Sequence, residues 1–357
     1  MGAALYRLYW FFREDVGAIP GRVIAFVFIA LIFLLPLVNS EPYLLRILIL
    51  MSIYIIFAVS WDFLSGFTGV LNFGHAAFFG ISAYATAMLN SNFGWPAWAT
   101  IPVGSFIAMV MGLVIGAPAL RLRGIYLALV TLAFPIMLQG LVYAFPDYTG
   151  GELGLFGISP LAFSRIAEYY IVLIIMLLSV LIMWKLTDLK SKMVRTGLIF
   201  RAINQDEITA RACGTNTTFY KFLAFAGSGF FCGVSGGLYA HFIKVVGPST
   251  LELLFSFNAI LWTIFGGMGT IFGPVVGVCL LFPLTEFLGV HPLGEEIRFL
   301  LLSVVLILTL LFMPEGISVW VLDKIEAECP RCKLTNYARR KKCRACGAQL
   351  HLEHGGE

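Results

Sequence analysis

Four cysteines near the C-terminal end of the chain have the spacing of a metal site. Cys329 and Cys332 form one C-x2-C pair, and Cys343 and Cys346 form a second pair ten residues later. Two such pairs can supply four thiolates in tetrahedral geometry, which predicts structural Zn²⁺. A tail of about forty residues builds little core, so the metal would provide most of its folding energy. A four-thiolate iron site and a redox dithiol are the alternatives.

A second group of reactive side chains lies in a strongly apolar region. Residues 61–75 read WDFLSGFTGVLNFGH, with Asp, Ser, Thr, Asn and His among aromatic residues and glycines. Polar groups at membrane depth are costly and therefore tend to face a bundle interior or a cavity. We predict that 66–75 is a bent or broken element beside a translocation path. The residues expected there are Gly66, Thr68, Gly69, Asn72, Phe73, Gly74 and His75. As a lone histidine, His75 is more often a satisfied interior residue than a direct ligand.

The sequence contains no constellation typical of catalysis. A G-x4-G-K-[ST] loop is absent, so the chain has no phosphate cradle of its own. No Ser-His-Asp set and no paired carboxylates stand out in the apolar segments. We therefore predict no catalytic residues, and if ATP drives this protein, another chain must hydrolyse it.

Composition indicates what must position these groups. The chain has 357 residues, of which 59% are hydrophobic and 12% charged, and its mean hydropathy is +0.90. Soluble domains carry roughly 25% charged residues. Lipid must therefore cover much of the surface, which predicts an all-α polytopic membrane protein. The net charge of +4 is small and the basic residues flank apolar segments, so no nucleic acid partner is expected.

A membrane-spanning helix needs about 20 mostly apolar residues. About ten segments qualify as candidate spans: 22–39, 43–60, 67–90, 97–117, 125–145, 168–186, 219–241, 254–268, 271–289 and 297–313. The third segment and the two beside the glycine run 266–269 are the weakest. Short, glycine-interrupted segments of this kind predict broken or re-entrant helices.

The basic residues predict the orientation. With the N-terminus inside, most of the 24 Lys and Arg residues face the cytoplasm. We therefore expect a multi-pass protein of the cell (inner) membrane with both termini cytoplasmic. The expected parts are a cytoplasmic N-terminal segment 1–21, a transmembrane domain 22–316 and a cytoplasmic four-Cys tail 317–357.

Glycines recur at every fourth position in two of the candidate spans. Gly229, Gly233 and Gly237 form one ladder, and residues 269, 273 and 277 form the other. This spacing lets helix backbones approach closely in lipid, so helix packing explains these glycines better than a substrate path does.

The long polar stretch 185–221 is the feature that best indicates a soluble partner. Within it, 202–212 predicts one short amphipathic helix, with Ile203, Ile208 and Ala212 near one face. Gly214 fits the left-handed end of that helix. An exposed, partly apolar helix suits docking into a groove on another protein; a plain surface helix is the alternative.

Four stretches together resemble the permeases of branched-chain amino acid ABC transporters, specifically the larger of the two paired permeases. They are GFTGVLNFGHAAFFGISAY at 66–84, LRLRGIYLALVTLAF at 120–134, the stretch 202–225, and GGMGTIFGPVVG at 266–277. Their order and spacing cover roughly residues 45–315. The four-Cys tail is not part of the usual pattern of this family.

The resemblance implies a permease that pairs with a sister permease, two cytoplasmic ATPase subunits that use ATP, and an external solute-binding protein. It implies uptake of Leu, Ile and Val, or of a related small solute. It also marks 187–218 as the ATPase-coupling loop, although the spacing from Glu207 to Gly214 is one residue longer than the simple E-A-A-x3-G form. The residues of the loop that carry the match are Asp206, Glu207, Ala210, Arg211 and Gly214.

Two other functions fit parts of the sequence. An ion-coupled secondary transporter would need ionisable pairs inside the membrane, and the sequence offers few beyond Asp62, His75 and Glu286. A membrane enzyme with a catalytic zinc tail conflicts with a closed four-Cys site, which leaves no open position for substrate.

Overall fold

The structure is a computed structural model, and its described part is almost entirely helical. It describes residues 33–36, 41–122, 124–188, 195–290, 295–329, 335–337, 343, 346 and 349. Two compact units are present, of which the larger is Glu41–Gly316 and the other includes Ile317–Glu357. The expected cytoplasmic segment 1–21 and most of the first candidate span lie outside the described residues.

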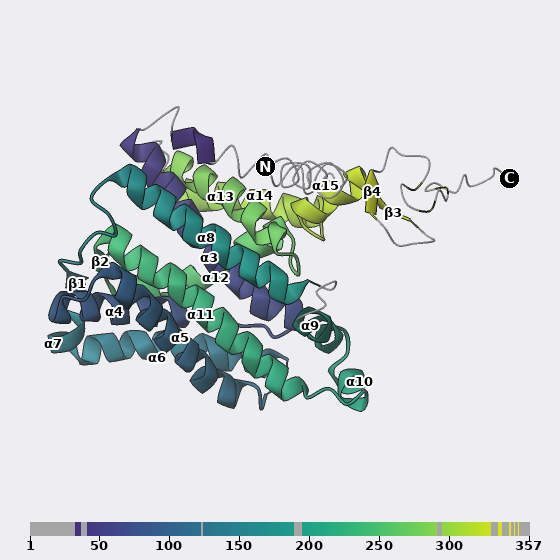
Figure 1. Cartoon of the computed structure of the whole chain (residues 1–357), viewed down its shortest axis with the longest axis horizontal. Helices are drawn as coiled ribbons and strands as arrows, with labels where there is room; N and C mark the ends of the chain where they lie inside the picture. Colours follow the sequence, from purple (N-terminus) through teal and green to yellow (C-terminus); the bar gives the residue numbers. More distant parts are fainter. Residues whose placement is uncertain are drawn as a thin grey trace, which may run out of the picture. The chain divides into compact units, whose positions relative to one another are not determined.

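The larger unit is a bundle of helices with one short strand pair (Figure 1). Its helices are α3 (Pro42–Thr68), α4 (His75–Phe93), α5 (Ala97–Ala119), α6 (Ile125–Ala144), α7 (Pro146–Thr149), α8 (Arg165–Thr187), α9 (Thr196–Gln205), α10 (Glu207–Ala212), α11 (Thr217–Ile243), the 3-10 helix η2 (Pro248–Leu251), α12 (Leu253–Gly266), α13 (Phe272–Val290) and α14 (Glu295–Phe312). Strand β1 (Leu155–Phe156) pairs antiparallel with β2 (Val245–Val246).

The second unit is small and is described by itself. It contains α15 (Ile317–Ile325), β3 (Glu326–Glu328) and β4 (Thr335–Tyr337). The two strands form an antiparallel hairpin, and Cys329 follows directly after β3.

Six of the described helices are long and apolar enough to cross a membrane. They are α3, α5, α6, α8, α11 and α13. The apolar helix α12 has only 14 residues, too short to cross a bilayer core alone. The expected all-α polytopic architecture is therefore present, whereas the count of about ten spans stays a prediction.

Helix α3 is the centre of the bundle. From Ile49 to Thr68 every residue except Tyr54 is buried. Trp61 and Phe57 are among the largest fully buried residues. Helices α8, α11, α12 and α13 pack around it. A helix that is apolar and buried all round must lie inside a bundle rather than at its lipid-facing edge.

The helices α5 and α11 approach through the predicted glycine ladder. A Cβ atom added to Gly229 would lie 2.8 Å from the carbonyl oxygen of Ala108. One added to Gly233 would lie 2.7 Å from the Cα atom of Ser105. Backbones that meet this closely leave no space for side chains, so the predicted role of this ladder in helix packing is confirmed.

The second ladder brings α12 against α13. A Cβ atom on Gly273 would lie 2.0 Å from the Gly267 carbonyl oxygen, and one on Gly277 would lie 1.9 Å from the Trp262 carbonyl oxygen. These contacts also confirm packing for Gly273 and Gly277. The third member, Gly269, lies in the α12–α13 turn with a φ of +78°.

The predicted break in 66–75 is present, but its position differs from the expected span ends. Helix α3 continues to Thr68 instead of ending near 60, and α4 begins at His75 instead of 67. Gly69 ends α3 in the left-handed conformation, with a φ of +73°, and its N–H donates to the Ser65 carbonyl. A residue without a Cβ adopts this helix end at little cost, so the helix stops here.

Candidate functional site

The segment between α3 and α4 is held from two sides. The Trp61 indole donates to the Asn72 carbonyl at 2.7 Å, and the Asn72 N–H donates to the Ser65 hydroxyl at 3.3 Å. From α6, the Thr131 hydroxyl accepts from the Phe73 N–H at 3.1 Å. The side chains of Trp61, Ser65 and Thr131 therefore replace hydrogen bonds that these backbone groups would have made in a continuous helix.

The first amides of α4 are also satisfied by side chains. The Asn72 side-chain oxygen accepts from the Gly74 N–H at 2.9 Å, and the Ser256 hydroxyl of α12 accepts from the Ala76 N–H at 2.8 Å. A Cβ on Gly74 would lie 2.1 Å from the Thr131 carbonyl oxygen, so only glycine fits. The break is therefore a built junction of α3, α4, α6 and α12.

His75 is fully buried at this junction. Its Nε2 lies 3.1 Å from the Phe57 carbonyl oxygen and 2.9 Å from the Ser60 hydroxyl. Because the Ser60 hydroxyl donates to the Phe57 carbonyl, it can accept from the ring, which fits an Nε2 that carries the hydrogen. Among the described residues, Nδ1 has no hydrogen-bond partner. This geometry suits an interior histidine, and contact with solute stays a prediction.

The expected single helix over 202–212 is wrong, because Asp206 divides it into α9 and α10. Asp206 has an extended backbone, with φ −157° and ψ 108°. Its carboxylate accepts from the Ile208 N–H at 2.9 Å and from the Thr209 hydroxyl. An aspartate side chain that can accept from nearby backbone N–H groups favours the N-cap of a new helix over the interior of a continuous helix.

The predicted shared face is wrong for the same reason. Ile203 of α9 is buried, whereas Ile208 of α10 is 72% exposed and Ala212 is exposed. The predicted left-handed end is confirmed at Gly214, whose φ is +82°. There the Thr215 N–H donates to the carbonyl of Ala210 at 3.1 Å.

Helix α9 is packed on the C-terminal end of α3. The ring of Phe200 is fully buried, edge-on to Phe63 with ring centres 5.6 Å apart. The Arg201 guanidinium lies over the Phe67 ring, 5.5 Å from its centre. Aromatic pairs and cation–π contacts of this kind each add to the stabilisation from burial.

Helix α10 is fixed to the start of α11 by charges. The Glu207 carboxylate pairs with Lys221 at 2.7 Å and with Arg211 at 2.6 Å. Arg211 also donates through Nε to the Thr217 hydroxyl at 2.8 Å. The two short helices are therefore attached to two different long helices, α3 and α11.

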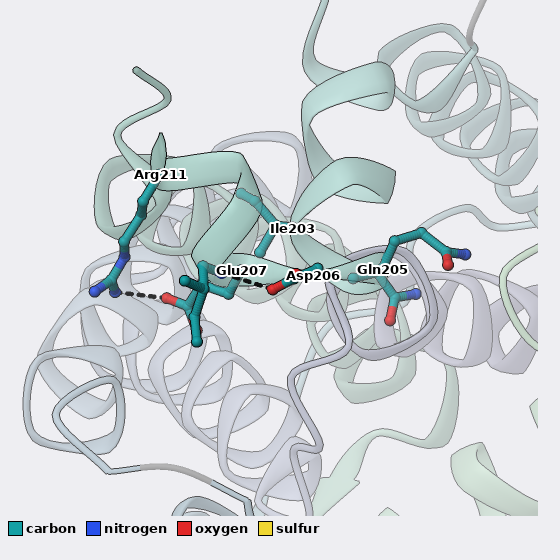
Figure 2. A pocket seen from close by; sticks show the side chains of 7 residues that line it. Ile203, Gln205, Asp206, Glu207 and Arg211 are labelled. Atoms are coloured by element: carbon teal, nitrogen blue, oxygen red, sulfur yellow. Dashed lines mark hydrogen bonds and ion pairs between the residues drawn. The ribbon is translucent and has the colours of Figure 1, made fainter. Parts of the chain in front are cut away.

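A surface hollow of about 370 Å³ lies where α9 meets α10 (Figure 2). Its lining residues are Ile203, Asn204, Gln205, Asp206, Glu207, Ile208 and Arg211. Figure 2 shows the Arg211–Glu207 ion pair at one side of it and the Gln205 side chain at the other. The surface combines an exposed apolar residue, Ile208, with charges of both signs.

The carboxyl groups of this segment predict a dependence on pH. Hydrogen bonds from Thr209, and then from the Ile208 amide, hold the pKa of Asp206 below its usual range. Partial burial raises the pKa of Glu207, but the hydrogen bond and charge of Lys221, with Arg211 and Thr217, offset this and leave it lowered. Because both folded-state values are depressed, their stabilisation is present above the ordinary carboxyl pKa of about 4 and is lost as pH falls further.

We therefore expect the unfolding temperature of the purified protein to fall between pH 5 and pH 3, and to fall less steeply in Glu207→Gln. Thermal unfolding in mild detergent across this range checks the difference. Glu252→Gln, at the start of α12, is the control. Equal pH slopes for Glu207→Gln and the unchanged protein would contradict the role of the Glu207 pair.

Three of the four predicted metal ligands are described, and their thiols converge. The ligand atoms of Cys329, Cys343 and Cys346 all lie within 4.8 Å of one another. Cys329 and Cys343 are buried, and the sulfur atoms of Cys329 and Cys346 are 3.5 Å apart. Cys332 lies outside the described residues. A trio of close thiols suits a soft metal ion, since thiolates are the ligands that zinc and iron–sulfur sites use.

The family of the chain follows from comparison with known proteins. The family described as "Branched-chain amino acid transport system / permease component" matches residues 43–310. The chain belongs to this family. It is a permease subunit of an ABC importer and not an enzyme. It is also a multi-pass membrane protein, as the long apolar helices require.

Two relatives extend the match over most of the permease. The chain is 28% identical over 323 residues to the high-affinity branched-chain amino acid transport system permease protein LivM of Escherichia coli K12, covering 82% of this chain and 72% of the relative. It is 29% identical over 297 residues to LivM of Salmonella typhimurium LT2, covering 74% and 67%.

At the other end of α11 the permease has an anchored loop that sequence reasoning missed (Figure 1). The His241 ring donates through Nδ1 to the Ser159 carbonyl at 2.7 Å, and its Nε2 accepts from the Thr100 hydroxyl at 2.8 Å. Asn90 accepts from the Ser159 N–H at 2.8 Å and donates to the Trp95 carbonyl at 2.7 Å. The only signal in the sequence was a histidine and an asparagine at the ends of apolar segments.

Replacing His241 by phenylalanine is expected to destabilise this loop. The change keeps a ring but removes its hydrogen bonds to the Ser159 carbonyl and the Thr100 hydroxyl, and that hydroxyl can then donate only to the Ala97 carbonyl. The loss of one such hydrogen bond costs about 0.5–1.5 kcal/mol. We expect a lower unfolding temperature and faster proteolysis within 155–163. Thr100→Ser retains a hydroxyl and is the matched control. An unchanged proteolysis rate in His241→Phe would mean that the ring does not hold the loop.

Proposed function

We propose that this permease imports Leu, Ile and Val, or a related small solute, across the cell (inner) membrane. The observation that carries the proposal is the match to LivM, a branched-chain amino acid transport permease, over most of both chains. The proposed complex contains a sister permease, two cytoplasmic ATPase subunits and an external solute-binding protein. ATP is used by the ATPases and is not bound by this chain.

The α9–α10 segment is the proposed site of ATPase coupling. Its residues Asp206, Glu207, Ala210, Arg211 and Gly214 belong to a surface element with an exposed apolar side chain and a hollow beside it. The segment is also attached to both α3 and α11, so a push on it reaches the core of the bundle. These features support docking of a soluble protein on the cytoplasmic side, where we place both termini.

The junction between α3 and α4 is proposed to lie beside the translocation path. It combines polar side chains with irregular backbone at membrane depth, which is tolerated only inside protein or beside a water-filled cavity. The residues concerned are Gly66, Thr68, Gly69, Asn72, Phe73, Gly74 and His75. Access would alternate because the ATP-bound ATPases and the solute each bind the two states of the bundle with different free energy.

The tail is proposed to hold structural zinc through four thiolates, with Cys332 completing the trio. Residues 317–357 would then form a cytoplasmic zinc-ribbon-like domain that follows the transmembrane domain 22–316 in the chain. The β3–β4 hairpin, which Cys329 follows directly, suits such a ribbon. Iron held by the same four thiolates is the alternative.

Reconstitution tests the proposed transport function. The permease, expressed with the proteins encoded beside it, would be placed in vesicles with the binding protein inside the lumen and labelled leucine, and ATP would be supplied outside. We expect leucine efflux into the ATP-containing compartment, competition by isoleucine and valine, and no competition by urea. Transport that follows an ion gradient without ATP would contradict the ABC mechanism, and competition by urea alone would change the proposed solute.

A further inference from the structure

Asn204 joins α9 to the last turn of α3. Its side-chain amide donates to the Gly66 carbonyl at 2.9 Å. The last carbonyls of a helix have no partner within the helix, so Asn204 satisfies one of them. Gly69 touches the same side chain, because a Cβ placed there would lie 2.6 Å from the Asn204 side-chain oxygen. The end of α3 is therefore shaped to receive this asparagine.

Asp62 joins the same stretch of α3 to the turn between α12 and α13. Its Oδ1 accepts from the Gly269 N–H at 2.8 Å. The residue is fully buried, and Oδ2 has no hydrogen bond within the described residues. Residues 62 and 66 are four positions apart, so they lie on one face of the helix, one above the other. A buried carboxyl oxygen that accepts from one backbone N–H makes a directional contact that is costly to leave unmade.

Gly66 takes part in both contacts, because its carbonyl accepts from Asn204 and its Cα lies against Asp62 and Gly269. A Cβ on Gly66 would lie 1.9 Å from Asp62 Oδ1 and 2.7 Å from the Gly269 nitrogen. The far side of the turn is equally close, because a Cβ on Gly316, after α14, would lie 2.4 Å from the Gly267 Cα. The α12–α13 turn is thus in close contact both with α3 and with the segment that follows α14.

We propose that Asn204 and Asp62 are positioning residues that carry displacement of the α9–α10 segment to the α12–α13 turn, through the last turn of α3. The proposal rests on the proposed ATPase coupling by α9–α10. The physical basis is a continuous series of contacts. The Gly66 carbonyl of α3 accepts from Asn204 of α9, and the Asp62 side chain, one helical turn earlier, accepts from Gly269 in the α12–α13 turn.

The test uses the intact transporter complex. Asn204→Ala removes the donor to Gly66, and Asn92→Ala, at an exposed asparagine near the end of α4, is the control. The first readout is hydrogen exchange in residues 262–272, measured with and without a non-hydrolysable ATP analogue. The second readout is solute transported per ATP hydrolysed. Co-purification of the ATPases is measured on every variant.

In the unchanged complex and in Asn92→Ala, we expect the ATP analogue to alter exchange in 262–272. In Asn204→Ala the ATPases should stay bound, the response of 262–272 should disappear, and transport per ATP should fall about ten-fold, within the range of coupling between two sites. A normal response and a normal ratio in Asn204→Ala would overturn the proposal. Loss of the ATPases from Asn204→Ala would also overturn it, because Asn204 would then belong to the docking surface.

A second pair of variants keeps the test informative if Asn204→Ala folds poorly. Asp62→Asn preserves an oxygen that accepts from Gly269, whereas Asp62→Ala removes it. We expect the alanine variant to lose coupling about ten-fold and the asparagine variant to retain most of it. Equal effects of the two would contradict a role for the Asp62–Gly269 contact. Failure of the unchanged permease to bind ATPases would instead refute the proposed function.

Discussion

Changing Asp206 and Arg211 together to alanine is expected to release the ATPases from the permease and to abolish most ATP-driven uptake. Asp206 caps α10. Arg211 pairs with Glu207 within α10 and donates to Thr217 at the start of α11. Without both, α10 loses its N-terminal cap and the Arg211 contact to α11, and only the contacts of Glu207 with Lys221 and Thr217 still attach it. We expect affinity for the ATPases to fall about thirty-fold or more, the effect of losing one strong interface contact.

Co-purification in mild detergent measures this effect. The double variant and the unchanged chain are tagged, expressed with the neighbouring proteins, and compared for the ATPases that stay bound. Asp147→Ala with Arg165→Ala is the matched control, since it removes an exposed acid and an exposed base near the α7 and β1 end of the bundle. ATPases that remain bound to the Asp206 and Arg211 variant would show that docking lies elsewhere.

Removing metal from the tail is expected to unfold it. Structural zinc contributes about 10–16 kcal/mol in small peptides that fold around it, more than so short a tail could replace. We expect one zinc per chain by elemental analysis, and rapid proteolysis after residue 325 in chelator or in Cys329→Ser. Cys332→Ser tests the fourth ligand in the same way.

Cys213→Ser, at an exposed thiol outside the tail, is the control and should leave the metal content unchanged. Iron instead of zinc would be seen directly in the elemental analysis and in visible absorption. A tail without metal that resists protease equally well with and without chelator would exclude the metal site altogether.

The helix break could be predicted from the sequence because its signal is local. Asn72, Gly74 and His75 follow one another in a segment too polar and too glycine-rich for an ordinary span. The end of α3 could not be placed, because whether Gly66 is helical depends on Asp62, Gly269 and Asn204, and two of these are distant in the sequence. Long-range contacts of this kind leave no periodic pattern.

For the α9–α10 segment, the sequence predicted the end but not the break. Its position and its left-handed Gly214 were predictable, because charge and glycine identify a surface loop. The single helix was not, since Asp206 can cap a helix or lie within one, and the outcome depends on the anchoring of Phe200 to α3 and of Glu207 to α11. The pattern of apolar residues alone placed Ile203 and Ile208 on one surface, which the break at Asp206 prevents.

The backbone contact between α5 and α11 has a mechanical consequence. At Gly229 and Gly233 the backbone of α11 lies directly against that of α5, so we expect the two helices to move together as a rigid pair. Helix α11 has 27 residues, a length of about 40 Å. It begins beside α10 and ends beside the loop that His241 holds. Tilting this pair at its α10 end must therefore also displace its other end, so that movements at the two ends are linked.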